Sequence, residues 1–430
     1  MPISLNAFFR RFFLTGFLFV LVLLWAGCEE TYRPVANPIP APGGNPEATH
    51  YALVVNSNDG SMTPPSPPPG APPITVGPSV TEIDVSGDSN IGNHVAGLNP
   101  VHAAFSPGFA IAYVVNQGDN TLSAFSPISG VGSTVYTIPL QQSSTEPNAG
   151  ASYVTAVSGV AFVTESALNR VAAVNTAGLN IQAFVPVGVN PVSVAATSDG
   201  RKAYVVNQGS NTVSVISTKD NTNIANLPVG STPGPITISS DNNYVFVGNE
   251  GDGTVSVIDT NADVVTNTLT VGSNPTELVW DNNLQRLYVV DTGSAAITII
   301  DGHTFPQTIL RTVSTSATPV AVAPLDNGAK FYVLFLGNPG HVEVYDALGF
   351  YKRGSVTVDN NAMPNGLPAL NQVLLTAAPG STKVYAVNYN GVNSANPNIT
   401  GSTSIIRTLD DTVTLNLPSP SPHPTFVTAQ

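Results

Sequence analysis

The 430-residue sequence has few charged residues, one cysteine and a single long apolar run, which lies near its start. Charged residues make up 10% of the chain, and its 14 basic residues form no cluster. An acidic protein without a basic patch repels phosphate backbones, so we expect no binding to nucleic acid. Cys28 is the only cysteine, which excludes an intramolecular disulfide. The sustained 3.6-residue periodicity of amphipathic helices is also missing.

The apolar run near the start indicates a signal peptide. Arg10 and Arg11 precede 13 predominantly apolar residues, Phe12 to Leu24. This run is shorter than the roughly 20 residues that a membrane-spanning helix needs, and it is typical of a signal-peptide core. We therefore expect residues 1–27 to be removed. The rest keeps all 27 acidic residues and 12 of the 14 basic ones, a formal charge of −15.

The residues around the expected cleavage point resemble the bacterial lipobox. The segment is LWAGC at residues 24–28, with Trp25 where the family usually has an aliphatic residue. The resemblance implies that Cys28 is lipidated and becomes the N-terminus of an extracytoplasmic lipoprotein. Residues 10–14 (RRFFL) also resemble a twin-arginine signal, with Phe9 in place of the usual Ser or Thr. The Sec and Tat export routes therefore both stay open.

A repeat of 42 residues runs through the middle of the chain. The segments AYVVN, VFVGN and LYVVD place Tyr204, Phe246 and Tyr288 at intervals of 42 residues. Phe162 lies 42 residues before Tyr204, and weaker copies of this segment contain Leu53, Tyr113, Tyr332 and Tyr385. Each clear copy is followed by a Gly/Asn turn, an alternating run such as TVSVI, a Val-Gly pair and a proline. Short apolar or alternating runs bounded by Gly, Asn, Asp and Pro predict four strands, a to d, per repeat.

Residues 203–260 resemble the YVTN-type β-propeller repeat, from which they depart mainly by Val206 in place of Thr. Recognisable copies cover most of residues 51–428. The resemblance implies an all-β propeller of four-stranded antiparallel blades. Stacking such sheets around an axis buries the faces that one sheet alone would expose. Propellers include both enzymes and binding proteins, so the fold does not decide the function.

The number of copies predicts eight blades, with seven, which is frequent in this family, as the alternative. Strand b is expected to begin near residues 51, 111, 160, 202, 244, 286, 329 and 383. Strand a is expected near residues 101, 153, 192, 235, 276, 319, 372 and 424. The first strand b has no strand a before it, and the last strand a has no strand b after it. Pairing these two closes the ring and removes both free edges.

The chain is thus expected to comprise a signal peptide (1–27), a Pro-rich tether (28–50) and a monomeric propeller (51–430). Four insertions interrupt the repeat, at residues 56–73, 140–152, 358–371 and 389–401. The first and last join strand b to c and the others join d to the next a, so all four are expected on one face. Variable loops on a rigid scaffold often bind ligands, although neutral insertion in tolerant turns is the alternative. The tether should reach the opposite face, which leaves the loops turned away from the membrane.

The sequence carries no recognisable pattern of a catalytic, cofactor or metal site, so no catalytic residue, metal or cofactor is predicted. Haem attachment needs a CxxCH motif or axial histidines, and a zinc site needs clustered ligands. The histidines, none of which has a paired spacing, are His50, His94, His102, His303, His341 and His423. Residues 250–253 (EGDG) lack the length and the ligand count of a calcium loop.

Several recurring residues are expected to be structural. Aspartates after strand a, which should form Asx turns, are Asp199, Asp241, Asp281 and Asp326. Asparagines after strand b, which should hydrogen-bond the next turn, are Asn116, Asn207, Asn249 and Asn388. The repeat aromatics should pack between blades. Trp280 is the only tryptophan after the signal peptide, and we expect it in the core.

The sequence therefore favours a lipid-anchored binding or scaffold module in the bacterial cell envelope, with a protein or an envelope polymer as partner. The alternative is a small-molecule hydrolase or lactonase at the mouth of the central channel, where carboxylates from different blades could meet. Convergent carboxylates would favour this enzyme, and a channel of aliphatic or small residues would favour the scaffold. A surface-layer or adhesive component is a third possibility, which differs from the first mainly in membrane leaflet.

Overall fold

The computed structural model describes nine segments of the chain: residues 50–57, 78–108, 110–127, 134–143, 145–335, 340–359, 375–388, 401–419 and 424–429. The chain divides into two compact units, residues 1–47 and 48–430, and every described residue belongs to the second unit. The expected signal peptide, the tether up to residue 49 and the lipidation site Cys28 therefore lie outside the described residues. No helix among the described segments is long and apolar enough to cross a membrane.

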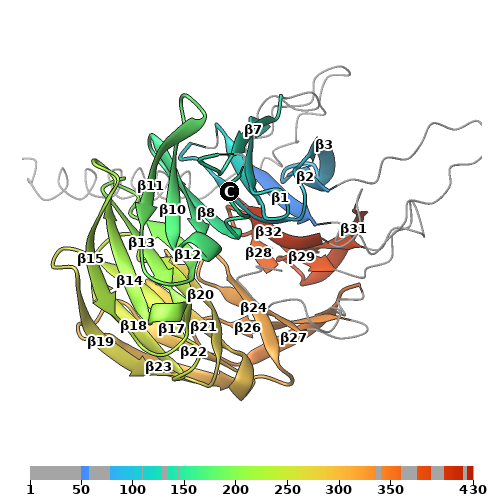
Figure 1. The fold of residues 1–430 in the computed structure, drawn as a ribbon. Coiled ribbons are helices and arrows are strands. Elements are labelled where there is room, and N and C mark those ends of the chain that lie inside the picture. The colour runs from blue at the N-terminus through green and yellow to red at the C-terminus, as the bar shows by residue number, and fades with distance from the viewer. Residues whose placement is uncertain are drawn as a thin grey trace, which may run out of the picture. The chain divides into compact units, whose positions relative to one another are not determined.

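The described residues form eight four-stranded antiparallel sheets, the blades of a β-propeller (Figure 1). The first four blades, each from strand a to strand d, are β32 (Pro424–Ala429), β1 (Tyr51–Asn56), β2 (Ser79–Asp84) and β3 (Ser89–Val95); β4 (Pro100–Phe105), β5 (Ala112–Asn116), β6 (Thr121–Phe125) and β7 (Tyr136–Pro139); β8 (Ala151–Val157), β9 (Val160–Glu165), β10 (Arg170–Asn175) and β11 (Asn180–Pro186); and β12 (Pro191–Ala196), β13 (Lys202–Asn207), β14 (Thr212–Ser217) and β15 (Thr222–Pro228).

The other four blades are β16 (Pro233–Ile238), β17 (Tyr244–Asn249), β18 (Thr254–Asp259) and β19 (Val264–Thr270); β20 (Pro275–Asp281), β21 (Arg286–Asp291), β22 (Ala296–Asp301) and β23 (Thr308–Ser314); β24 (Pro319–Pro324), β25 (Lys330–Phe335), β26 (His341–Asp346) and β27 (Lys352–Thr357); and β28 (Leu375–Ala377), β29 (Lys383–Asn388), β30 (Ser402–Arg407) and β31 (Thr412–Pro418). Among the described b–c connections, three contain a short 3-10 helix: η2 (Ser166–Leu168), η3 (Gln208–Ser210) and η4 (Thr292–Ser294).

The C-terminal strand closes the ring, as the sequence predicts. Strand β32 pairs antiparallel with β1, with Val427 opposite Val54 (Figure 1, red beside blue). The inner strand of each blade contacts the inner strand of the next, including β28 with β32 and β32 with β4. The count of eight blades and the closure by the last strand are thus confirmed. The strand starts also agree closely, although β8 and β16 each begin two residues before the expected 153 and 235, and residue 372 lies outside the described segments.

The repeat aromatics pack between blades, as expected. Tyr204 is fully buried, and its hydroxyl donates to Asp263 Oδ1 in the c–d turn of the next blade at 2.8 Å. Lys202 begins the same strand, and its Nζ also reaches Asp263 and the Thr260 carbonyl, both at 2.7 Å. The same contact closes the ring, because Lys383 in blade 8 donates to Asp88 and to the Val85 carbonyl in blade 1, both at 2.6 Å.

The expectation for Trp280 was only partly right. It is half-buried and stacks on Phe246, with ring centroids 5.4 Å apart, while its Nε1 lies 3.4 Å from Ser240 Oγ. Trp280 is the second-last residue of β20, close to the turn that leads to strand b. Because this end of the inner strand is near the surface, part of the large indole ring remains exposed to water.

Three of the four recurring aspartates form the expected Asx turns. Asp199 and Asp241 each accept a hydrogen bond at 3.0 Å from the main-chain nitrogen two residues ahead, and Asp281 does so at 2.9 Å. In blade 7 the expected residue, Asp326, is replaced in this role by Asn327, which accepts from the main chain of Ala329 at 3.0 Å.

The recurring asparagines bond to strand c and not to the next turn, which corrects the expectation. Asn207 is fully buried, and its Nδ2 donates to Thr212 Oγ1 at 3.1 Å and to Ser214 Oγ at 2.9 Å. Asn249 also accepts a hydrogen bond from the Gly230 main chain at 3.1 Å. A Cβ on Gly230 would lie 2.6 Å from Asn249 Cγ, so the Val-Gly pair of the repeat leaves room for this amide.

Candidate functional site

Irregular register in the inner strands distinguishes the centre of the ring. The pairing of strand a with strand b shifts near the start of strand a, for example between Pro275 and Glu277 and between Pro319 and Ala321. Such shifts free main-chain groups and re-aim side chains. The third residue of the inner strand varies most in chemistry from blade to blade. From blade 1 to blade 7 it is Phe426, His102, Tyr153, Ser193, Pro235, Glu277 and Ala321.

Three of these residues, from blades 1 to 3, form an aromatic stack. The His102 ring lies 3.7 Å from the Tyr153 ring and 4.4 Å from the Phe426 ring, centroid to centroid. His102 Nδ1 lies 3.4 Å from the main-chain nitrogen of Val154. Burial lowers the pKa of His102 to about 3, so its imidazole is neutral at physiological pH. This side of the centre is packed and uncharged.

Glu277 enters the centre from blade 6. Its Oε2 accepts a hydrogen bond from the Val322 main chain at 2.8 Å, while the buried Oε1 has no partner among the described residues. Burial raises the pKa of Glu277 to about 8. Burial, and to a smaller extent the charge of Glu277, raises the pKa of Tyr153 to about 12. Because the charge of Glu277 acts on Tyr153, the two side chains lie within electrostatic reach of each other.

Few described carboxylates lie at the inner strands. Glu250 of blade 5 follows strand b and lies against Gly234 of β16, and burial raises its pKa to about 7. The described inner strands carry two carboxylates, Glu277 and Asp281, both in β20, and Asp281 is engaged in its turn. No group of three or more His, Cys, Asp or Glu side chains that could hold a metal ion occurs among the described residues. Most other inner-strand residues are Pro, Ala, Val and Thr.

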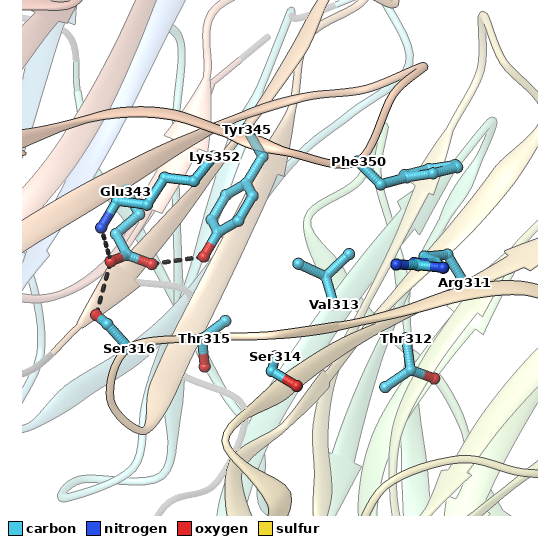
Figure 2. Close-up of a pocket in the computed structure, with 10 residues that line it drawn as sticks. All are labelled: Arg311, Thr312, Val313, Ser314, Thr315, Ser316, Glu343, Tyr345, Phe350 and Lys352. Carbon is cyan, nitrogen blue, oxygen red and sulfur yellow. Dashed lines mark hydrogen bonds and ion pairs between the residues drawn. The ribbon is translucent and has the colours of Figure 1, made fainter.

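A pocket of about 510 Å³ lies at the rim, between the outer strand of blade 6 and the outer strands of blade 7 (Figure 2). This volume is within the usual range of small-ligand sites, about 300–1,000 Å³. Strand β23 and the connection after it contribute residues 311–316, and blade 7 contributes Glu343, Tyr345, Phe350 and Lys352. We call this pocket the rim groove.

A buried carboxylate organises one end of the rim groove. Glu343 is 1% exposed, and its Oε1 accepts hydrogen bonds from Ser316 Oγ at 2.6 Å and from Lys352 Nζ. Its Oε2 accepts from the Tyr345 hydroxyl at 2.5 Å. These donors hold the pKa of Glu343 below its usual value despite burial. The carboxylate is therefore ionised and fixes three donors in place.

The other end of the rim groove carries Arg311. Figure 2 shows Arg311 and Val313 on the side of β23 that faces Tyr345 and Phe350, whereas Thr312 and Ser314 point to the opposite side. Arg311 is exposed and forms no ion pair within the described part of the chain. The groove thus presents an unpaired cation at one end and the partly exposed Lys352 ammonium at the other.

The rim groove was missed by the sequence reasoning, which gave no role to Arg311, Glu343 or Lys352. The sequence did contain one indication of this groove: among the described outer strands (strand d), β23 and β27 are the ones that carry Lys or Arg. Of the four expected binding loops, most of 56–73, 358–371 and 389–401 lies outside the described residues.

The remaining insertion, 140–152, is described except for residue 144, and it is held against blade 3. Arg170 bonds Glu146 of this insertion at 2.7 and 3.0 Å, and it also pairs with Glu165. The Arg170 guanidinium lies 3.8 Å from the centre of the Phe184 ring. Burial raises the pKa of Glu165 to about 7, although Arg170 acts against this shift. These contacts tie the insertion down.

Comparison with known proteins supports the fold. The family model "Lactonase, 7-bladed beta-propeller" matches residues 88–266, less than half of the chain. Similar solved structures include the dihydro-heme d1 dehydrogenase NirN in complex with DHE, at 10% identity and a TM-score of 0.66, covering 92% of this chain and 78% of that one. No curated protein gives a significant match.

Two further solved structures have the same fold. Apo AztD from Citrobacter koseri is 12% identical, with a TM-score of 0.60, and the match covers 89% of this chain and 98% of that one. Kuenenia stuttgartiensis hydrazine synthase is 16% identical, with a TM-score of 0.52, covering 72% and 95%. At such low identity these likenesses concern the fold alone. This chain is a β-propeller, with eight blades where the family description has seven.

Proposed function

We propose that this protein is a lipid-anchored, extracytoplasmic β-propeller that acts as a non-enzymatic binding module, and that the rim groove is its ligand site. The observation that carries the proposal is the groove itself. It combines a ligand-sized volume, a cation without an ion-pair partner among the described residues, and the side chains of Ser316, Tyr345 and Lys352, which Glu343 holds in position. Preorganised side chains lower the entropic penalty of binding.

The groove is built for binding and not for bond making. Both oxygens of Glu343 are occupied by donors, and its carboxylate is ionised, so it offers neither a free base nor a proton donor. The hydroxyl of Tyr345 is likewise committed to Glu343, and burial, together with the charge of Glu343, raises its pKa. Polar groups that satisfy one another form a frame for a ligand.

The location rests on the sequence. The lipobox-like segment that ends at Cys28 would anchor the protein through lipid to the bacterial envelope. The ligand would then be a protein or a polymer of that envelope. A test is the Cys28→Ser variant in the native host: it should lose incorporation of labelled fatty acid and leave the membrane fraction. Retention of both would contradict the anchor.

Photo-crosslinking tests the groove. A photoreactive residue replaces Val313, which faces the groove, in the full-length protein, in cells. The matched control is Leu227 in blade 4, because both residues face the second residue of strand c, Ile297 or Val213. We expect an adduct from position 313 that is lost with Arg311→Ala and absent from position 227. Equal adducts at both positions, or none at position 313, would overturn the groove as the ligand site.

A small-molecule hydrolase at the channel remains the second candidate, because one observation favours it. Glu277 has an oxygen without a hydrogen-bond partner among the described residues and lies within electrostatic reach of Tyr153, and the lactonase family model matches part of the chain. If this candidate holds, the full-length protein hydrolyses simple lactones and Glu277→Gln abolishes that activity. If the purified protein hydrolyses none of a lactone panel, or if Glu277→Gln retains full activity, a Glu277-dependent hydrolase is excluded.

A further inference from the structure

The outer edge of blade 6 presents unpaired main-chain groups to the rim groove. Among the described strands β23 pairs with β22 alone. The main-chain nitrogen of Thr315 donates to the Ala295 carbonyl at 2.9 Å, so it points towards β22. Main-chain groups alternate in direction along a strand. The N–H and C=O of Thr312 and Ser314 therefore point away from β22, to the free edge.

Proline blocks the same position in four of the eight blades. In every blade the last residue of strand d faces the first residue of strand c. In blades 2, 3, 4 and 8 this last residue of strand d is a proline: Pro139, Pro186, Pro228 and Pro418. The following residue points inwards, as when Val229 N donates to the Asn211 carbonyl at 3.1 Å. The missing N–H of each proline would thus have pointed outwards. Proline on an edge strand prevents pairing with another chain.

Blade 6 has Ser314 at this position, so its outward N–H is available. The other blades without proline there have Val95, Thr270 and Thr357. Strands β3 and β19 carry no Lys or Arg, and the two cations of β27, Lys352 and Arg353, pair with Glu343 and Asp346. Within the described part of the chain, blade 6 therefore combines an edge without proline, a cation without an ion-pair partner and the adjoining groove.

We infer that the free edge of β23 binds an extended, acidic peptide segment of a partner protein, which adds to blade 6 as a fifth strand. This inference rests on the proposed binding role of the rim groove. The outward N–H and C=O groups of Thr312 and Ser314 supply the main-chain hydrogen bonds. Alternate side chains of the peptide enter the groove, where one carboxylate pairs with the Arg311 guanidinium.

The surroundings of Arg311 support this choice of partner. Val313 and Phe350 lie next to Arg311 in the groove and offer apolar contact to the peptide side chain that follows the carboxylate (Figure 2). At the far end the Lys352 side chain is 45% exposed although its ammonium is bonded to Glu343, so it adds positive charge to the groove. A basic peptide would meet two cations here and is disfavoured.

The test measures binding of fluorescent peptides of about seven residues to the full-length Cys28→Ser protein. The peptides alternate Val and Thr, with Asp, Asn or Lys at the centre. We expect binding in the order Asp, Asn, Lys, and a loss of about tenfold or more with Ser314→Pro. Thr270→Pro in blade 5 is the matched control and should leave the affinity unchanged. Arg311→Gln should remove the preference for Asp over Asn.

Peptides that are N-methylated on alternate residues provide a test on the unaltered protein. Methylation of the amides that face β23 should abolish binding, and methylation of the others should not. Equal affinity of all methylated forms, or full affinity of Ser314→Pro, would overturn the strand-addition inference. If the crosslinked ligand from cells is an acidic polysaccharide that depends on Arg311, the peptide inference fails while the groove remains a binding site. If ligand capture and peptide binding depend on neither Arg311 nor Ser314, both the rim groove as ligand site and the strand addition to β23 are refuted.

Discussion

Glu277 at the centre of the ring and Glu343 in the rim groove are both buried glutamates, 9% and 1% exposed, yet their pKa values move in opposite directions. Glu277 receives one hydrogen bond, from the Val322 main chain, and burial raises its pKa to about 8. Glu343 receives hydrogen bonds from Ser316, Tyr345 and Lys352, and these lower its pKa. The number and charge of the donors, and not burial alone, decide whether a buried carboxyl is ionised.

The comparison separates two uses of the same repeated blade. At the centre, where inner strands from all blades meet, His102 and Glu277 are held in their neutral forms and become part of the packing. At the rim, where outer strands reach water, Glu343 keeps its charge and organises donors around a pocket. Four predictions test this contrast.

The largest effect is expected from removal of the last strand. Deletion of residues 421–430 takes away β32, and with it Phe426 from the central stack and the inner strand of blade 1. The remaining chain has an open ring and should lose its cooperative thermal transition, as followed by circular dichroism. A transition unchanged in temperature and sharpness would contradict closure by β32.

Glu277→Gln should change the pH dependence of stability. The pKa of folded Glu277 lies above its unfolded value, so its stabilisation is complete below pH 4.5 and is lost as pH rises to about 8. The slope in this window is at most about 1.4 kcal/mol per pH unit. The free energy of unfolding of the variant, from urea titrations, should match wild type near pH 5 and exceed it at pH 8. Parallel curves would contradict the buried neutral carboxyl.

Glu343→Gln should change the pH dependence of stability in the opposite direction. The lowered pKa of Glu343 means that its contribution is present above pH 4.5 and is lost as pH falls below that value. We expect the variant to be less stable than wild type by about 2 kcal/mol at neutral pH, since charged hydrogen bonds are lost, and by less under acid conditions. The same urea titrations provide the measurement. A penalty that grows on acidification would show that Glu343 is not ionised.

The smallest effect on stability is expected from Ser314→Pro. Its main-chain N–H points to the free edge, so proline removes no internal hydrogen bond, and the change should be within about 0.5 kcal/mol. Thr315→Pro is the matched control, because Thr315 N donates to the Ala295 carbonyl, and its loss should be larger by about 1 kcal/mol or more. Thermal unfolding of both variants would reveal the difference. Equal losses would show that the assignment of edge-facing groups is wrong.

The sequence predicted the fold well, because the information for each blade is local and repeated. The 42-residue spacing of Tyr204, Phe246 and Tyr288 was sufficient to number the blades, and the two unmatched strands at the ends implied closure. The asparagine positions were recognised, but their partners were misjudged. The side chain of Asn207, at the end of strand b, donates to the hydroxyls of Thr212 and Ser214, which are two residues apart on strand c. Which hydroxyls the amide can reach depends on the register between strands b and c.

By itself, the sequence determined an all-β chain, eight blades, closure by the last strand and the absence of any local catalytic or metal-binding motif. Tertiary structure decided where chemistry is concentrated. Arg311 and Glu343 are 32 positions apart, and a groove exists between them because the outer strand of blade 6 packs against blade 7. Likewise, whether the N–H of Ser314 is free or paired depends on strand register, which is set by the pairing of β22 with β23 and cannot be read from residue types alone.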